Sequence, residues 1–402
     1  MKKKALAAVI ICIVALTAVV LSACTSATVV LDLNGGIYNG TDEALVVEAG
    51  GTLYLGDFKP EKEDAVISGW VDEEGNFYGA DSYIVPVNGS TLTAVYEGVL
   101  KYTRVEDGYA VSATEGYSAE NVVIPSEYDG LPVTEVAAGA FANCTSMRTL
   151  RIPDSVVRIG RGALSGCTSL ESIILPFVGP TADVSVGTNN NGMAYVFGLS
   201  SGSSWATFPN LTQITVTDAA VSLPNGAFEN MTSLRYVNVG SNVTALGARA
   251  FSGCSNLVSV ILPEGCTSIG ERAFANCSKA TITVKGAVTS LGANAFYNSG
   301  ITSITLGEGL SSIPAGCFEG SSLTSIVLPS SVTSINSAAF RNCSRLTKVE
   351  VSASVTLYSS AFNGCANLTD AGLVFGSGGE FTFAEGAKEN AFGGTKVTIY
   401  NN

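Results

Sequence analysis

Residues 131–153 read LPVTEVAAGAFANCTSMRTLRIP, and residues 154–176 read DSVVRIGRGALSGCTSLESIILP. In both stretches a marker residue, Phe141 or Leu164, is followed by Cys three residues later and by apolar residues at the sixth, ninth and eleventh positions. The marker recurs further along the chain as an aromatic residue, in steps of 23, 23, 22, 22, 22 and 22 residues, at Phe228, Phe251, Phe274, Phe296, Phe318, Phe340 and Phe362. A fixed period of this length indicates a solenoid of stacked units.

Each unit predicts two local structures. The Leu-x-x-Ile-x-Leu segment alternates apolar and polar residues, as a half-buried strand does, and the Ala-Phe-x-x-Cys segment suits one short helical turn. One unit cannot bury its apolar face alone, whereas stacked units can share a continuous core beside a parallel ladder of strands. The predicted fold is therefore a β-rich α/β solenoid of 22–23-residue units, preceded by a small β domain.

The repeated units resemble leucine-rich repeats of the BspA type, which occur in surface proteins of host-associated bacteria and of some protists. The resemblance covers about residues 100–402, and its motif is specific because it recurs many times in register. We assign residues 99–402 to this repeat domain. Residues 99–130 look like a degenerate opening unit that caps the array, and residues 378–402, with Ala391 and Phe392, look like a shortened closing rung.

One irregular step separates Leu164 from Phe228, which lie 64 residues apart. The frame of the other units places Trp205 in the marker position and leaves an insertion at about residues 177–208, which contains Tyr195 and Phe197. Insertions in solenoids form loops on one face, and binding residues are often found on such loops. The sequence leaves two interpretations: the aromatic residues of the insertion contact a ligand, or they cover an edge of the core.

Residues 24–98 show short alternating segments with Gly-rich turns and no 23-residue period. Asn34-Gly35-Gly36 predicts a hairpin turn, and Trp70 would be the aromatic anchor of a small β domain. The segments at residues 29–36, 67–70 and 91–96 resemble, in order, the Listeria-Bacteroides repeat, a β-grasp-like module seen in internalin B-repeats. The resemblance implies that this module is a spacer that lifts the solenoid off the membrane. A direct binding role of the module is the alternative.

The N-terminus carries a targeting signal. Three lysines precede an apolar run at residues 5–20, which is followed by Leu21-Ser22-Ala23-Cys24. This arrangement predicts a signal peptide at residues 1–23, and its last four residues resemble the lipobox of bacterial lipoproteins. The resemblance implies that Cys24 carries the lipid, which anchors an exported protein to the membrane at the bacterial cell surface. An uncleaved transmembrane anchor is the alternative, because the apolar run is nearly long enough to span a bilayer.

Charge and residue types restrict the chemistry. Cleavage of the predicted signal peptide would remove three lysines and no acidic residue, which changes the net charge from −13 to −16. Because the chain is acidic, we expect no nucleic-acid partner. The chain has no histidine, which excludes Ser-His-Asp and Cys-His catalytic arrangements and histidine-bearing zinc sites. Paired carboxylates could still hydrolyse glycosides, but the acidic residues lie mainly in turns. We therefore predict no enzyme, no cofactor and no metal.

The ten cysteines require a separate interpretation. Six fall three residues after a marker residue, where other units have Met231 or Phe208, so the position is predicted to be a core position: Cys144, Cys167, Cys254, Cys277, Cys343 and Cys365. These six also form three pairs on adjacent units, and an exported protein meets oxidising conditions. Buried free thiols are favoured over disulfides, because side chains on stacked strands point in parallel and a disulfide needs the two Cβ atoms about 3.8 Å apart.

The residues between the buried positions of each Leu-x-x-Ile-x-Leu segment should point outward. They are mostly small and uncharged, and we select Tyr236, Asn238 and Arg151 as ligand contacts, together with Tyr195, Phe197 and Trp205 of the insertion. The function predicted from the resemblance is adhesion to a protein or glycan of a host or neighbouring cell. A structural scaffold of the cell envelope is the alternative, and an enzyme acting on polysaccharide is a third hypothesis.

Overall fold

The computed structural model describes residues 10–12, 27–49, 52–62, 65–73, 77–80, 82–84, 88–182, 192–200, 205–377 and 379–397. The chain divides into two compact units. The first contains residues 1–101 and 113–118, and the second contains residues 102–112 and 119–402, so the division falls within strands β9 (Leu100–Val105) and β10 (Gly108–Ala113). The signal sequence, apart from residues 10–12, and Cys24 lie outside the described residues.

The first unit is a mixed β-sheet with a small hydrophobic core packed against one of its faces. The strand order is β1-β3-β2-β8-β5-β6, where the strands are β1 (Ile10–Cys12), β2 (Ala27–Asp32), β3 (Leu45–Ala49), β5 (Ala65–Asp72), β6 (Phe77–Gly79) and β8 (Ser90–Gly98). A short pair, β4 (Leu53–Tyr54) and β7 (Tyr83–Ile84), flanks it beside the 3-10 turn η1 (Leu55–Asp57). Trp70 is fully buried among Leu31, Val47 and Phe58. The predicted aromatic anchor is therefore a core residue.

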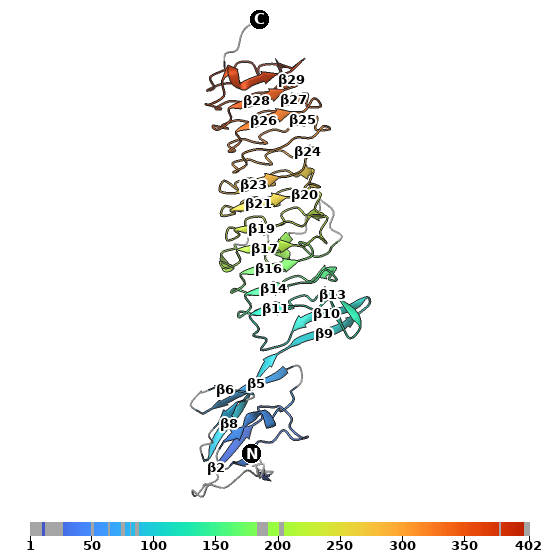
Figure 1. Ribbon diagram of the computed structural model, residues 1–402, viewed down its shortest axis with the longest axis vertical. Coiled ribbons are helices and arrows are strands. Elements are labelled where there is room, and N and C mark those ends of the chain that lie inside the picture. The colour runs from blue at the N-terminus through green and yellow to red at the C-terminus, as the bar shows by residue number, and fades with distance from the viewer. Residues whose placement is uncertain are drawn as a thin grey trace. The chain divides into compact units, whose positions relative to one another are not determined.

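The second unit is a solenoid whose rungs place strands in two stacks. A seven-stranded parallel sheet runs along one side, in chain order, through β11 (Asn121–Val123), β14 (Thr149–Arg151), β16 (Ser172–Leu175), β17 (Gln213–Val216), β19 (Tyr236–Asn238), β21 (Ser259–Leu262) and β23 (Thr281–Val284) (Figure 1). The predicted β-rich solenoid with 22–23-residue units is confirmed.

Further strands complete the solenoid. The opening sheet contains β9, β10, β12 (Glu127–Tyr128) and β13 (Leu131–Val136), and β13 also pairs with β15 (Arg158–Ile159). The second stack begins with β18 (Ser222–Leu223), β20 (Ala245–Leu246), β22 (Ser268–Ile269) and β24 (Ser290–Leu291). It continues with β25 (Ser312–Ile313), β27 (Ser334–Ile335), β29 (Ser354–Leu357) and β31 (Glu380–Phe383).

The sheet of the first stack is interrupted after β23. A separate three-stranded sheet follows, made of β26 (Ser325–Leu328), β28 (Lys348–Val351) and β30 (Leu373–Phe375). In the described chain, residues 301–306 of the intervening rung form no strand, and the isolated bridge between Val288 and Leu306 joins them to the preceding rung. The strand ladder is thus divided, although the core continues through this rung.

Stacked marker phenylalanines form the centre of that core. From Phe251 to Phe362, successive rings lie 4.9–5.6 Å apart with interplanar angles of 1–7°, and Phe392 extends the stack 5.2 Å beyond Phe362. Every marker from Phe228 to Phe362 is fully buried. Burying one such side chain contributes about 1.5–3 kcal/mol, so the regular spacing provides much of the stability of the solenoid.

The segment around each marker is a tight turn between rungs. The Phe251 N–H donates to the carbonyl of Ala273 on the next rung, at 2.8 Å, and the Cys254 N–H closes the turn on the Phe251 carbonyl. Two residues after the marker, Asn230 and Gly253 have φ angles of 61° and 77°, a left-handed conformation that Asn and Gly tolerate and that ends a helix. The predicted helical turn is therefore limited to this single turn.

The eight cysteines of the solenoid are free, buried thiols. In five of them the thiol donates a hydrogen bond of 2.9–3.1 Å to the carbonyl of a marker Phe in the preceding rung: Cys167, Cys254, Cys277, Cys343 and Cys365. Burial raises the pKa of Cys167 and of Cys277 to about 12 each. These cysteines therefore act as small apolar residues that also satisfy a buried carbonyl.

Candidate binding surface

The outer face of the seven-stranded sheet consists of two rows of side chains. Because strand residues alternate between the two faces, every second side chain points away from the core. The strand register places Gln213, Tyr236 and Ser259 in one row, and Thr215, Asn238 and Ile261 in the other. Buried Ile214, Val237 and Val260 lie between them. The predicted outward orientation of these residues is confirmed.

Tyr236 and Ile261 are the large apolar side chains exposed at the centre of this face. Tyr236 is 44% exposed and Ile261 is 53% exposed, on neighbouring strands β19 and β21. The guanidinium carbon of Arg235 lies 6.0 Å from the centre of the Tyr236 ring, within range of a cation–π contact. Asn238 donates from Nδ2 to the Thr215 hydroxyl at 3.3 Å. The face therefore combines an exposed aromatic ring with polar groups on a hydrogen-bonded sheet.

Arg151 lies in the same row as Asn238 but three strands away. The register runs from Arg151 through Ile174 and Thr215 to Asn238, a distance of about 14 Å at 4.8 Å for each strand. The structure therefore brings Tyr236 and Asn238 together and leaves Arg151 outside their immediate surroundings. Only an extended ligand could contact all three.

The insertion residues have a different role from the one predicted. Phe197 is 1% exposed and Trp205 is 6% exposed, and with Phe208 they form a cluster of tilted and T-shaped rings 4.5–6.1 Å apart. The prediction that Phe197 and Trp205 contact a ligand is therefore wrong, because both rings are buried in the core of the rung that follows Leu164. The interpretation that these aromatic residues cover a core edge is correct for this pair.

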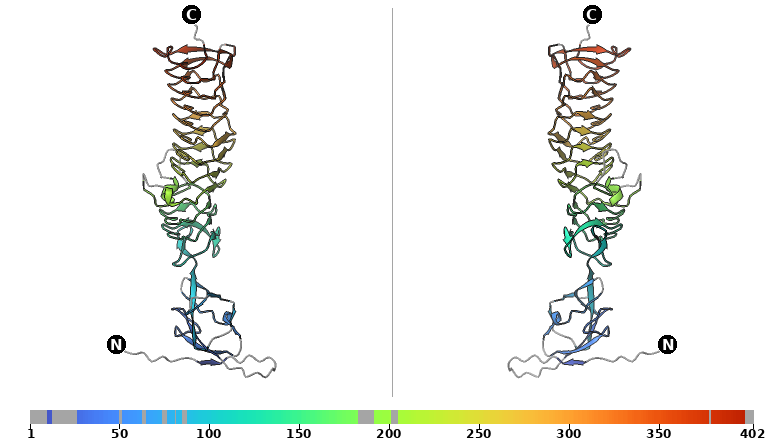
Figure 2. Two further views of the ribbon diagram at one scale, coloured as in Figure 1. Left: turned by 90° about the vertical axis from the view of Figure 1, so that its left-hand side faces the viewer. Right: turned by 90° about the vertical axis from the view of Figure 1, so that its right-hand side faces the viewer.

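The backbone of the insertion explains how Phe197 enters the core. The Leu164 N–H donates to the Val196 carbonyl, which is the bond that each marker makes to the residue before the next marker. Phe197 thus follows Leu164 in the spine, at the end of the short helix α1 (Gly192–Val196), and Figure 2 shows α1 at the side of the stack of rungs. Trp205 begins the 3-10 turn η2 (Trp205–Thr207) and donates from Nε1 to the Glu229 carbonyl. Tyr195 is half-buried and remains a predicted contact.

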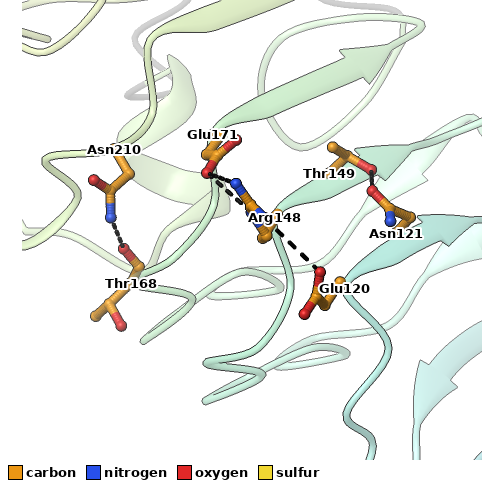
Figure 3. Close-up of polar contacts among 7 residues, drawn as sticks. All are labelled: Glu120, Asn121, Arg148, Thr149, Thr168, Glu171 and Asn210. Atoms are coloured by element: carbon orange, nitrogen blue, oxygen red, sulfur yellow. Dashed lines mark hydrogen bonds and ion pairs between the residues drawn. The ribbon is translucent and has the colours of Figure 1, made fainter.

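Ion pairs occupy the edge where the strands of this sheet begin. Arg148 lies between Glu171, 2.7 Å away, and Glu120, 3.9 Å away, on three successive rungs (Figure 3). The Glu171 side chain is the main cause of the raised pKa of Arg148. Thr149 donates to Asn121 on the strand beside it. These exposed groups pair with one another across neighbouring rungs.

A shallow hollow lies at the opposite ends of β19 and β21. Its volume is about 340 Å³, and it is lined by Asn238, Ser259 and Ile261 of the outer face together with Asp218, Ser241 and Lys285 from the turns. The Ser241 backbone N–H donates to Asp218 Oδ1 and lowers the pKa of that carboxyl group. Sequence analysis missed Asp218 and Lys285, because they lie in turns of different rungs and no local motif joins them.

Other kinds of site have no structural support within the described ranges. Those residues contain no group of three or more His, Cys, Asp or Glu side chains able to hold a metal ion. No helix formed by the described residues is long and apolar enough to cross a membrane. The outer face is taken as the candidate site because it exposes Tyr236 and Ile261 beside a hollow lined by polar groups.

The rungs, the phenylalanine spine and the exposed strand face define a leucine-rich-repeat solenoid. The model of the BspA type leucine rich repeat region matches six copies, at residues 114–180, 202–282 and 280–374. This chain belongs to that family. A search of curated proteins found no match.

The chain is similar to solved structures from several bacteria. A leucine-rich cell surface protein of Faecalibacterium prausnitzii is 19% identical with a TM-score of 0.29, over 79% of this chain and 99% of that one. A leucine-rich repeat protein of Bacteroides ovatus is 20% identical with a TM-score of 0.36, over 71% and 88%. The pneumococcal vaccine antigen PcpA is 18% identical with a TM-score of 0.35, over 68% and 67%.

Proposed function

We propose that this protein is a binding or adhesion protein of the bacterial cell surface, and that the seven-stranded sheet contacts a protein or glycan of a host or neighbouring cell. The exposed Tyr236 and Ile261 among small polar side chains support this proposal most directly. Aromatic residues held rigidly on a surface lose little entropy on binding and are enriched among residues that dominate binding energy. The proposal assigns no catalytic activity to the chain.

Substitution of Tyr236 tests the binding face. We expect the purified protein to bind a ligand in a screen of extracellular-matrix proteins and glycans, and Tyr236→Ser to weaken that binding about tenfold or more. The affinity is measured by titration calorimetry. The control is Tyr358→Ser, because Tyr358 has a similar exposure of 41% and lies outside the seven-stranded sheet. Equal loss in both variants, or binding by neither variant nor the parent chain, contradicts the proposal.

We also propose that a lipid on Cys24 anchors the protein to the membrane. The proposal rests on the residues 21–24, which resemble a lipobox, after the apolar run at residues 5–20. Cys24→Ala is expected to abolish incorporation of labelled fatty acid into the protein. The control is Cys12→Ala, which removes the other cysteine of the N-terminal segment. Retention of the label in Cys24→Ala would rule out this anchor.

A further inference from the structure

Three cationic side chains near the binding face form no ion pair within the described part of the chain. Arg151, Arg235 and Lys285 form no ion pair with any residue whose position is described. By contrast, Arg148 is held by Glu171 at one edge of the same sheet, and Lys348 is paired with Glu350 in the separate three-stranded sheet. Other described cations of the solenoid, such as Arg249 and Arg345, also lack an ion pair, so these three are distinguished by their position beside the exposed face of a chain whose net charge is −13.

These cations surround the exposed centre of the sheet. Arg235 lies next to Tyr236 at the start of β19, and Lys285 follows β23 and lines the hollow. Arg151 lies at the end of β14, five strand steps from β23, which corresponds to about 24 Å. An anionic ligand along the sheet would therefore meet positive charge at several points, whereas a neutral ligand would leave these charges without a partner.

The chemistry of the hollow favours a sugar. Asn238 offers both a hydrogen-bond donor and an acceptor, the Asp218 carboxylate accepts, and Ser259 can do either. Ile261 supplies an exposed apolar surface beside them. A hydroxylated ring needs closely spaced donors and acceptors next to an apolar patch. The volume of about 340 Å³ falls at the small end of the range for ligand sites.

We propose that the hollow binds a carboxylated sugar unit of an acidic glycan. Lys285 pairs with the sugar carboxylate, Asn238 and Asp218 hydrogen-bond to ring hydroxyls, and Ile261 contacts the apolar face of the ring. The rest of the glycan follows the sheet past Tyr236 and Arg235. This assignment rests on the proposed function, since it names the ligand class of the same face. An acidic protein would need a larger buried apolar anchor than this shallow hollow provides.

The test compares two probes of equal length. Titration calorimetry measures binding of an oligogalacturonate and of its carboxyl-reduced neutral counterpart to the purified protein. We expect the acidic probe to bind at least about tenfold more tightly, because a charge-assisted hydrogen bond is stronger than a neutral one. Lys285→Gln should weaken binding of the acidic probe about tenfold and weaken binding of the neutral probe much less.

The control is Lys279→Gln. This substitution removes the same charge on the same rung, but Lys279 precedes β23 and its ammonium donates to Asn256 instead of lining the hollow. We expect it to change affinity less than twofold. Equal loss in both lysine variants, or equal binding of the two probes, overturns the inference.

Two further outcomes separate this inference from the proposed function. Binding of a protein, or of a neutral glycan, that depends on Tyr236 and not on Lys285 overturns the acidic-glycan assignment and leaves the adhesion proposal standing. Failure of the chain to bind any glycan or protein overturns both.

Discussion

Phe274→Ala is expected to lower the free energy of unfolding by about 3–5 kcal/mol, the usual cost of removing a fully buried aromatic ring. The ring lies 4.9 Å from that of Phe251 and 5.6 Å from that of Phe296, nearly parallel to both. Its loss leaves a cavity in the middle of the spine, which neighbouring rungs cannot close because their backbones are hydrogen-bonded to one another. Urea denaturation followed by circular dichroism measures the change.

Phe375→Ala is the control for this substitution. Phe375 is also a phenylalanine of the solenoid, but it is 45% exposed and contacts only Phe381 among the ring pairs of the described residues. We expect a loss of about 1 kcal/mol, which corresponds to one aromatic pair. A similar loss in both variants would show that the stack contributes no special stability.

Gly292→Ala is expected to lower the free energy of unfolding by about 1–3 kcal/mol through overpacking. A Cβ atom at this position would lie 2.2 Å from the Glu271 backbone nitrogen and 2.5 Å from its Cα atom. Both are backbone atoms of the preceding rung, so no side-chain rotation relieves the contact. The rungs must move apart, which weakens bonds such as that from the Gly292 N–H to the Ile269 carbonyl, now 2.8 Å long.

Gly265→Ala provides the matched control. A Cβ atom there would meet nothing closer than the Thr244 methyl group, 3.9 Å away. Both substitutions restrict the unfolded chain equally, so the difference between them reports the contact in the folded state. We expect Gly265→Ala to change stability by less than about 1 kcal/mol in either direction. If Gly292→Ala unfolded at the same urea concentration as the parent chain, the close contact between residue 292 and the preceding rung would be contradicted.

The repeat could be predicted from the sequence because its buried positions recur in phase. Phe251, Cys254 and Leu257 occupy the same places in the turn as their counterparts one unit later, so the period alone defines the stack. The outward position of Tyr236 and Asn238 follows from strand alternation in the same way. Periodicity therefore determined the parts of the fold that repeat.

The parts that do not repeat were less predictable. Phe197 enters the spine from a segment without periodic spacing, and a single aromatic residue carries no signal that distinguishes core from surface. The hollow joins Asp218, Asn238 and Lys285 from turns and strands of separate rungs. Its shape depends on how turns of different rungs lie beside one another, which composition and spacing do not specify.

Hydrogen bonds from each rung to the next also determine how the solenoid can vary in length. In a stack where each unit contacts its neighbours, a whole unit can be gained or lost without rebuilding distant ones. One such change would shift every later strand by about 4.8 Å along the axis while leaving the opening sheet as it is. The reach of the sheet can thus be adjusted in fixed increments, independently of the chemistry displayed at any single strand.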